Sequence, residues 1–223
     1  MSFSPEWDAR YAEDTHLSMW PWSDLVSYCH RYAGPFSPKT KVLEIGFGAG
    51  ANIPFFRTLG VAYSGIEGSG SIHSRVCAKF PELAQTLYLG DFLSFQFPDT
   101  YDLIVDRGSM THNSTKGIKD GLKHLSEYLP AGGIYIGIDW YSTSHSDYLI
   151  GEACDEFTKF NLPNGQFAGV GRVHFSDEEH IVKLFSEAGF RVTRLEHKKN
   201  ITIVPDDGHL FASWNLVAEK SPR

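Results

Sequence analysis

The stretch Lys41-Val42-Leu43-Glu44-Ile45-Gly46-Phe47-Gly48-Ala49-Gly50 decides the fold class of this 223-residue chain. Its apolar half predicts a buried strand, and three alternating glycines follow. Glycine permits a tight turn with φ > 0 and lets a ligand lie against the main chain. Where such a turn enters a helix, free backbone N–H groups and the positive helix end face the ligand. The stretch therefore predicts a loop that binds a nucleoside-bearing cofactor.

Two cofactor classes compete for this loop. As Gly46-x-Gly48-x-x-Ala51 it satisfies the dinucleotide fingerprint, with Glu67 as the acid on the ribose. As Glu44-x-Gly46-x-Gly48-x-Gly50 it resembles motif I of the class I S-adenosylmethionine-dependent methyltransferases. Glu44 favours the second interpretation, because a carboxylate at the turn repels a pyrophosphate. S-adenosylmethionine instead brings an amino acid and a sulfonium.

Further segments follow in the order of the same family. Residues 61–67 read as a strand ending in Glu67, whose carboxylate can accept both ribose hydroxyls. Residues 86–92 end in Gly-Asp-Phe, where the resemblance implies an acid on the adenine amino group and an apolar residue beside the ring. Residues 101–112 resemble the fourth strand and the loop over the methyl donor, and residues 129–138 resemble the Pro-x-Gly-Gly turn into the fifth. The resemblance covers residues 40–140 by motif and 176–218 by element order only.

The resemblance implies S-adenosylmethionine as cofactor and a site formed by the loop and the strand ends. The predicted cofactor-binding residues are Glu44, Gly46, Phe47, Gly48, Gly50, Asn52, Glu67, Gly68, Asp91, Phe92, Asp106 and Arg107. Two positions depart from the family pattern. Phe47 is bulkier than the residue often found between the first two glycines, and Asp106-Arg107-Gly108 gives a charged floor.

Strands that alternate with helical stretches predict an α/β, doubly wound, mainly parallel seven-stranded sheet with a C-terminal antiparallel hairpin. Leu25, Tyr28, Cys29 and Tyr32 form a helical stripe inside an N-terminal helical extension, residues 1–38, before a methyltransferase domain over 39–223. Ser176-Asp177-Glu178-Glu179 predicts a capping box for a helix that stops at Gly189. Strands are expected at 190–198 and 210–218, with a short separate one at 201–204.

The segment 140–175 is too long for an ordinary connection and is rich in aromatic residues. We expect this insertion to lie above the strand ends and to form much of the acceptor pocket. The N-terminal aromatic residues Trp7, Tyr11, Trp20 and Trp22 are candidates for the other wall. The predicted acceptor-binding residues are Tyr11, Trp20, Arg107, Tyr141 and His145.

Transfer to a hydroxyl requires a base, and histidine suits neutral pH. His112 is the first candidate because it follows the loop of the fourth strand, and His145 is the second. A structural role at the start of a helix is the alternative for His112. Arg107 either holds an acidic substrate or pairs with a neighbouring carboxylate. No His-x-Glu or His-x-x-x-His pair lies near the predicted strand ends, so no metal is expected.

Charge and cysteine content narrow the function. A net charge of −7 and a pI near 5.8 argue against a non-specific nucleic-acid binder. Cys29, Cys77 and Cys154 show no metal-like spacing, which favours reduced thiols in the cytoplasm. Neither a signal peptide nor an apolar run of about 20 residues is present, so no membrane partner is expected.

We therefore expect a cytoplasmic methyltransferase that acts on a small-molecule acceptor at oxygen or nitrogen. The alternatives are a nicotinamide-dependent oxidoreductase that uses the same glycines, and a non-catalytic protein that binds S-adenosylmethionine as a scaffold. The sequence does not distinguish a monomer from a homodimer.

Overall fold

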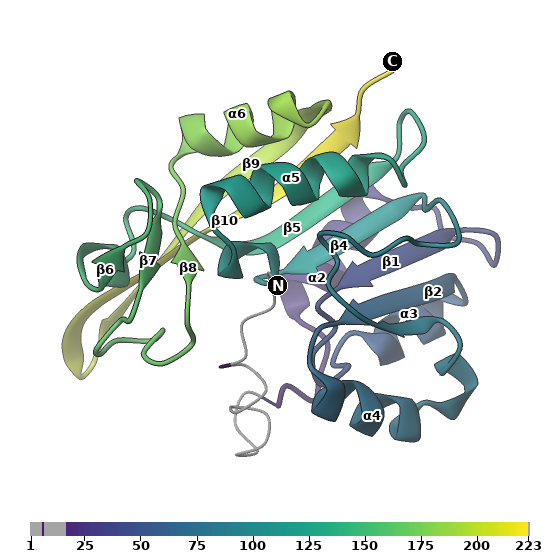
Figure 1. Ribbon diagram of the computed structural model, residues 1–223, viewed down its shortest axis with the longest axis horizontal. Coiled ribbons are helices and arrows are strands. Elements are labelled where there is room, and N and C mark those ends of the chain that lie inside the picture. Colours follow the sequence, from purple (N-terminus) through teal and green to yellow (C-terminus); the bar gives the residue numbers. More distant parts are fainter. Residues whose placement is uncertain (1–5, 7–16, 223) are drawn as a thin grey trace.

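The structure is a computed structural model that describes residue 6 and residues 17–222. A seven-stranded sheet runs through its centre in the order β3-β2-β1-β4-β5-β10-β9 (Figure 1). The strands are β1 (Lys41–Ile45), β2 (Ala62–Glu67), β3 (Leu87–Leu89), β4 (Leu103–Arg107), β5 (Ile134–Tyr141), β9 (Phe190–Ile203) and β10 (Asp206–Lys220). β10 is antiparallel to both β5 and β9, and the other neighbours are parallel. The predicted fold class is confirmed.

Helices cover both faces of the sheet. α5 (Thr115–Ser126) and α6 (Glu178–Glu187) share one apolar cluster with Leu43 and Ile45. α2 (Ser23–Tyr32), α3 (Ile53–Leu59) and α4 (Gly70–Lys79) share a second cluster with Val42. Neighbouring residues of a strand point to opposite faces, and both faces of β1 are buried, which explains its nearly continuous apolar sequence.

The N-terminal helix is part of this core. The predicted stripe is confirmed, because Leu25, Tyr28 and Cys29 are buried on α2 against the sheet. The division of the chain at residue 39 stays a prediction. None of the helices in the described part of the chain has the length and apolar character that crossing a bilayer requires.

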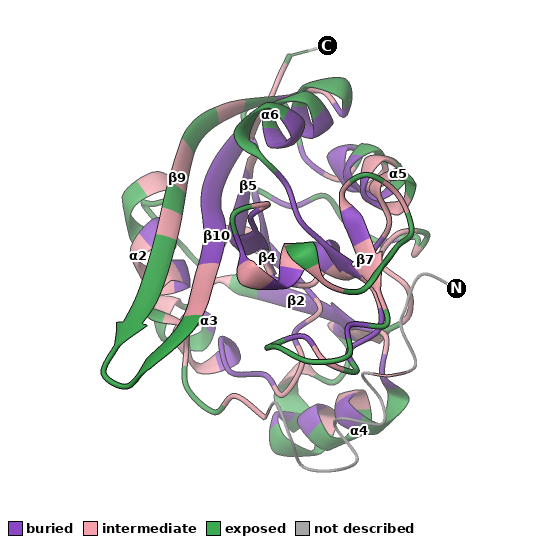
Figure 2. Ribbon diagram, turned by 90° about the vertical axis from the view of Figure 1, so that its left-hand side faces the viewer, coloured by how far each residue is buried: buried purple, intermediate pink, exposed green. Residues whose placement is uncertain are grey.

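The C-terminal hairpin differs from its prediction. β9 is one strand of 14 residues that pairs with β10 from Phe190↔Lys220 to Ile203↔Asp206, so a separate strand at 201–204 was wrong. Ladder pairing continues through the polar residues 198–200 because β9 is an edge strand with solvent on its free side. Figure 2 shows the tip of the hairpin extending, exposed, away from the helices. Its apolar residues Ile201 and Val204 are 63% and 87% exposed.

The start of α6 also differs by one residue from its prediction. Asp177 is the N-cap, and its Oδ1 accepts a 2.8 Å hydrogen bond from the backbone N–H of His180. Ser176 instead places Oγ 3.0 Å from Nε2 of His174. The predicted stop is confirmed, since the helix ends before Gly189, which has a φ of +83°.

The insertion after β5 folds into a small unit of its own. It contains the 3-10 helix η3 (Ser146–Leu149) and a three-stranded sheet of β6 (Glu152–Ala153), β7 (Thr158–Phe160) and β8 (Val173–His174). Its buried residues cluster with Tyr141 at the end of β5. Figure 1 shows the insertion on the side of the sheet toward which β1 and β4 point. The insertion is therefore placed to wall a site over the strand ends.

Candidate functional site

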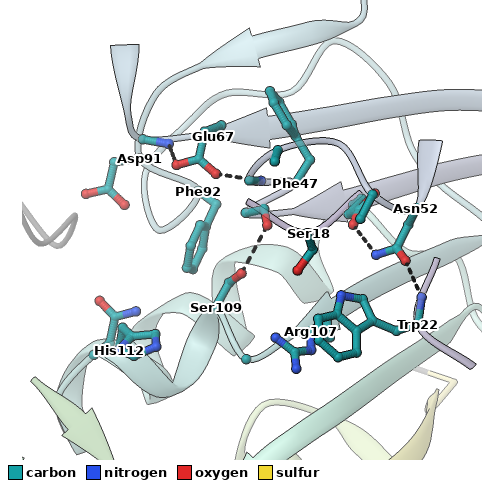
Figure 3. A pocket seen from close by; sticks show the side chains of 18 of the residues that line it. Ser18, Trp22, Phe47, Asn52, Glu67, Asp91, Phe92, Arg107, Ser109 and His112 are labelled. Atoms are coloured by element: carbon teal, nitrogen blue, oxygen red, sulfur yellow. Dashed lines mark hydrogen bonds between the residues drawn. The ribbon is translucent and has the colours of Figure 1, made fainter. Parts of the chain in front are cut away.

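A pocket lies over the carboxyl ends of β1, β2 and β4 (Figure 3). The strand order reverses between β1 and β4, which is the position where open α/β sheets bind ligands. The cavity volume is about 340 Å³, within the range of about 300–1,000 Å³ typical of ligand sites.

The glycine loop forms one wall of the pocket, as predicted. Gly46, Gly48 and Gly50 have φ values of +64°, +51° and +73°. A Cβ on Gly46 would lie 2.0 Å from Oγ of Ser109, so this position excludes any side chain. Gly50 is different, because a Cβ there would meet the side chains of Ile53, Val76 and Phe80. Gly50 does not line the pocket, so its predicted cofactor contact is corrected to a packing role.

Glu67, at the end of β2, organises the loop. Its Oε2 accepts a 2.9 Å hydrogen bond from the N–H of Gly48, and its Oε1 accepts bonds from the N–H groups of Gly68 and Ser69 at 2.9 and 3.0 Å. Burial raises the pKa of Glu67, and the three amide bonds lower it in part. A carboxylate has about four acceptor positions, so this side chain can also accept from a ligand in the pocket.

Glu44 is a second buried carboxylate in the pocket wall. Asn52 donates to its Oε1 at 2.8 Å, and the hydroxyl of Tyr63 donates to its Oε2 at 2.6 Å. Burial raises its pKa to about 7, and the nearby Glu67 and Asp106 add to the rise. Glu44 is therefore poised to lose its proton near neutral pH when a cation approaches.

Asp91 and Phe92 follow β3 and line the pocket, as the sequence predicts. Oδ1 of Asp91 accepts a 3.0 Å hydrogen bond from the N–H of Leu93, which fixes the turn. Gly90 donates its N–H to the carbonyl of Glu67 at 2.9 Å. This bond joins the ends of β2 and β3 and holds the two acidic side chains over one cavity.

Asp106 does not reach the pocket, contrary to its prediction. Its side chain is fully buried and accepts four hydrogen bonds, from the N–H groups of Ser109 and Met110, the indole of Trp140 and the hydroxyl of Tyr135. Burial raises its pKa to about 6. Asp106 shapes the loop after β4 from beneath and is neither a direct cofactor contact nor a solvated strand end.

Arg107 lines the pocket and pairs with a carboxylate, the second of its two predicted roles. Its Nη2 lies 3.0 Å from Oδ2 of Asp139, and its Cζ lies 3.5 Å from the centre of the Trp22 ring. Asp139 has an unusual φ of +56° beside a register shift between β5 and β10, and this bulge aims its side chain at Arg107. Arg107 therefore holds Trp22 against the mouth of the pocket.

His112 lines the same pocket, in the 3-10 helix η2 (Met110–His112). Its Nδ1 lies 2.9 Å from the carbonyl oxygen of Arg172 in the insertion. A carbonyl only accepts, so Nδ1 carries a proton in this contact. The bond ties the ring of His112 to the insertion.

Two of the predicted acceptor-binding residues do not line the pocket, and a third lies outside the described part of the chain. His145 is 1% exposed inside the aromatic cluster of the insertion, where burial lowers its pKa, so its predicted contact with the acceptor is wrong. Trp20 is 77% exposed and does not line the pocket, and Ser18 and Trp22 take this place. Tyr11 lies outside the described residues.

Other predicted residues line the pocket, together with residues that the sequence analysis did not select. Tyr141, Asn52, Phe47 and Gly68 line the pocket as predicted. Burial raises the pKa of Tyr141 to about 12, so its hydroxyl stays protonated. The lining residues absent from the predicted set are Ser18, Trp22, Ala49, Ala51, Gly90, Gly108, Ser109, Asn113 and Gln166. Trp22 is one of the N-terminal aromatic residues that the sequence analysis names as candidates for a pocket wall. Gln166 belongs to an irregular segment in which no sequence pattern indicates a pocket residue.

A family model described as a methyltransferase domain matches residues 11–195. No curated protein sequence matches the chain.

Solved structures share the fold at low identity. A SAM-dependent methyltransferase from Methanosarcina mazei is 17% identical with a TM-score of 0.69, covering 92% of this chain and 100% of that one. A SAM-bound amino pentose methyltransferase from Micromonospora echinaspora is 13% identical with a TM-score of 0.60, covering 98% of both chains. A glycopeptide N-methyltransferase in complex with sinefungin is 16% identical with a TM-score of 0.64, covering 94% of this chain and 90% of that one.

Proposed function

The chain belongs to the methyltransferase domain family of S-adenosylmethionine-dependent enzymes, and we propose that it methylates a small organic molecule at an oxygen or nitrogen atom. The acceptor, the roles of individual residues and a cytoplasmic location are parts of this proposal.

The observation that carries the proposal is the pair of buried carboxylates at the glycine loop. Glu44 and Glu67 both line the pocket and are 3% and 5% exposed. Opposite charges attract strongly where water is excluded, so this wall favours a cationic ligand and disfavours a pyrophosphate. S-adenosylmethionine carries a sulfonium and an ammonium group, whereas a nicotinamide dinucleotide brings two phosphates. The charge of the loop therefore supports the methyl donor over the dinucleotide.

We assign the parts of the cofactor to the strand ends in order. Glu44 and Asn52 face its amino-acid part, Glu67 its ribose hydroxyls, and Asp91 and Phe92 its adenine. The Gly46 turn lets the backbone approach the ligand closely, because no side chain fits there. S-adenosylmethionine supplies an electrophilic methyl group, so the main task of the protein is to position the acceptor in line with it.

We assign the removal of the acceptor proton to His112. Its Nδ1–H donates to the carbonyl of Arg172, and this bond orients a ring that lines the pocket. An imidazole beside the acceptor can take the proton as the acceptor atom loses it. His145 has no part in this step, because it lies outside the pocket.

Several features support a small acceptor. Trp22, Tyr141 and Gln166 also line the pocket, and the cavity volume of about 340 Å³ suits a small ligand. The net charge of −7 gives no electrostatic attraction to nucleic acid. Two methyltransferases of the same fold are described as acting on an amino pentose and on a glycopeptide.

A transfer assay tests this proposal. Purified protein is incubated with methyl-labelled S-adenosylmethionine and a panel of hydroxyl, amine and carboxyl acceptors, with RNA, DNA and an unfolded protein as further acceptors. We expect label in a small molecule only. Label in a macromolecule contradicts the acceptor class, and cofactor binding without transfer to any acceptor supports the scaffold alternative.

A further inference from the structure

Three metal-ligand side chains meet where the insertion contacts the β9–β10 hairpin, outside the pocket. His145, Asp147 and His209 each offer one ligand atom, and the three atoms lie within 4.8 Å of one another. His145 and Asp147 belong to the start of η3, whereas His209 belongs to β10. Two imidazoles and one carboxylate are a ligand set typical of divalent transition metals such as Zn²⁺.

The carboxylate of Asp147 is oriented toward both imidazoles. Its Oδ2 accepts a 3.0 Å hydrogen bond from the N–H of Phe167, and its Oδ1 lies 3.9 Å from Nδ1 of His145 and 3.9 Å from Nδ1 of His209. These separations are too long for hydrogen bonds. Tetrahedral Zn²⁺ with bonds of about 2.1 Å holds its ligand atoms about 3.4 Å apart. Small side-chain rotations therefore bring the three groups to coordination distance.

Each of the two imidazole rings has one nitrogen without a hydrogen-bond partner among the described residues. These nitrogens are Nε2 of His145 and Nε2 of His209, and both are buried. Nδ1 of His145 accepts a 3.0 Å hydrogen bond from the N–H of Asp147, and coordination through this nitrogen exchanges that bond for the metal. A buried ring nitrogen without a partner is uncommon in native proteins, so the described protein groups do not fully engage these two rings.

The surroundings hold the three groups in place. A Cβ on Gly165, which has a φ of +85°, would lie 2.4 Å from Oδ1 of Asp147, so bare backbone packs against the carboxylate. Three phenylalanine rings surround His145 at centroid distances of 5.0 to 5.8 Å: Phe167, Phe175 and Phe211. His145 and Asp147 are almost fully buried, but the side chain of His209 is 30% exposed. The inner side of the cluster is therefore packed, and its outer side, at His209, is partly exposed.

We propose that His145, Asp147 and His209 bind one divalent transition-metal ion, with Zn²⁺ as the best match and water in the fourth position. The ion ties η3 to β10 at a junction where Leu210 already donates its N–H to Oγ of Ser146 at 2.9 Å. This junction lies next to the pocket, because the ring of Tyr141, which lines it, has its centroid 6.3 Å from that of His145. The ion therefore fixes the insertion wall against the hairpin. Metal binding itself does not depend on the proposed function.

Metal titration of the full chain tests the site. The protein is treated with a chelator, dialysed and titrated with Zn²⁺ by calorimetry, with Co²⁺ as a spectroscopic substitute. We expect one equivalent to bind, with Co²⁺ absorption typical of a low-coordinate site and a rise in the thermal unfolding temperature. His209→Gln, at the most exposed ligand, is expected to lower the affinity by about 100-fold or more. Asp147→Asn is a second variant that keeps the size of the side chain.

Matched controls separate this site from other metal ligands. His30→Gln removes an exposed histidine on α2, and Cys154→Ser removes an exposed thiol; both are expected to bind like the wild type. No binding by the folded wild-type protein, or unchanged affinity in His209→Gln and Asp147→Asn, overturns the proposal. Binding of S-adenosylhomocysteine to the metal-free protein is measured in parallel. Its retention shows that a failed metal site leaves the proposed function standing.

Discussion

The backbone N–H of Gly48 donates a 2.9 Å hydrogen bond to Oε2 of Glu67, which joins the glycine loop after β1 to the acid at the end of β2. The sequence predicts both residues as cofactor contacts, and in the structure they also contact each other. The carboxylate therefore holds the loop in place as well as lining the pocket. A substitution at Glu67 is expected to affect both the free energy of unfolding and cofactor affinity.

Glu67→Gln tests this double role. An amide nitrogen cannot accept from a backbone N–H, so at least one of the three donors of the loop loses its partner. We expect a loss of about 1–3 kcal/mol in the free energy of unfolding and at least about tenfold weaker binding of S-adenosylhomocysteine. Urea denaturation and calorimetry measure the two effects. Wild-type cofactor affinity in Glu67→Ala contradicts the ribose assignment.

Gly46→Ala tests the close approach of the loop to Ser109. Both Gly46 and Gly60 have positive φ, at +64° and +68°, but a Cβ meets Ser109 at 2.0 Å only at position 46. Gly60→Ala is the matched control and is expected to cost about 1–2 kcal/mol from the backbone conformation alone. Gly46→Ala is expected to cost about 1–3 kcal/mol more and to abolish cofactor binding. The free energy of unfolding of both variants is measured by urea denaturation. Equal decreases would show that the side chain of Ser109 moves aside without an energetic penalty, which contradicts this prediction.

Glu44 predicts a pH dependence of stability. Its pKa is raised to about 7 in the folded protein against 4.5 for the ordinary carboxyl, so the folded state holds this proton more tightly than the unfolded state. The free energy of unfolding therefore falls as pH rises from about 4.5 to 7, by a total of about 3 kcal/mol from this group, and is flat above.

Asp106, whose pKa is raised to about 6, titrates in an overlapping pH range. The contribution of Glu44 is therefore measured as the difference in the free energy of unfolding between the wild type and a Glu44 variant. The free energy of unfolding is measured at several pH values between 5 and 8 for the wild type and Glu44→Gln. We expect the difference between the two proteins to change with pH up to about 7. A constant difference contradicts an elevated pKa at Glu44.

His112→Gln tests the proposed base. Once an acceptor is known, we expect methyl transfer to fall by about 10²–10⁴-fold, while the affinity for S-adenosylhomocysteine changes less than about twofold. Transfer to an acceptor with a lower pKa is expected to fall less, because such an acceptor needs less help to lose its proton. Transfer at the wild-type rate would leave His112 with the structural role of holding the carbonyl of Arg172.

The parallel sheet and the cofactor side of the site are predictable from the sequence for a common reason. The carboxyl ends of parallel strands meet at one edge, so the residues that end the predicted strands gather over one cavity. Glu44, Glu67 and Asp91 follow this rule, and all three line the pocket. The positive φ values of Gly46 and Gly48 likewise follow from glycine at a turn between a strand and a helix.

The misplaced residues depend on contacts that strand order does not determine. Asp106 also ends a strand, but its side chain turns beneath the loop to meet donors from β5, including Trp140. His145 lies in an irregular insertion. The composition of this segment indicates apolar packing but does not show which side chains point toward the pocket. The proposed metal cluster joins His145 to His209, which are far apart in the sequence. A short spacing between ligands therefore does not reveal the cluster in the sequence.

Calorimetric titration of the purified protein with S-adenosylhomocysteine, with NAD in a parallel titration, tests the central claim most directly. The buried carboxylates at the glycine loop predict micromolar binding of S-adenosylhomocysteine and no binding of NAD. Binding of NAD alone would contradict the cofactor assignment and leave only the fold.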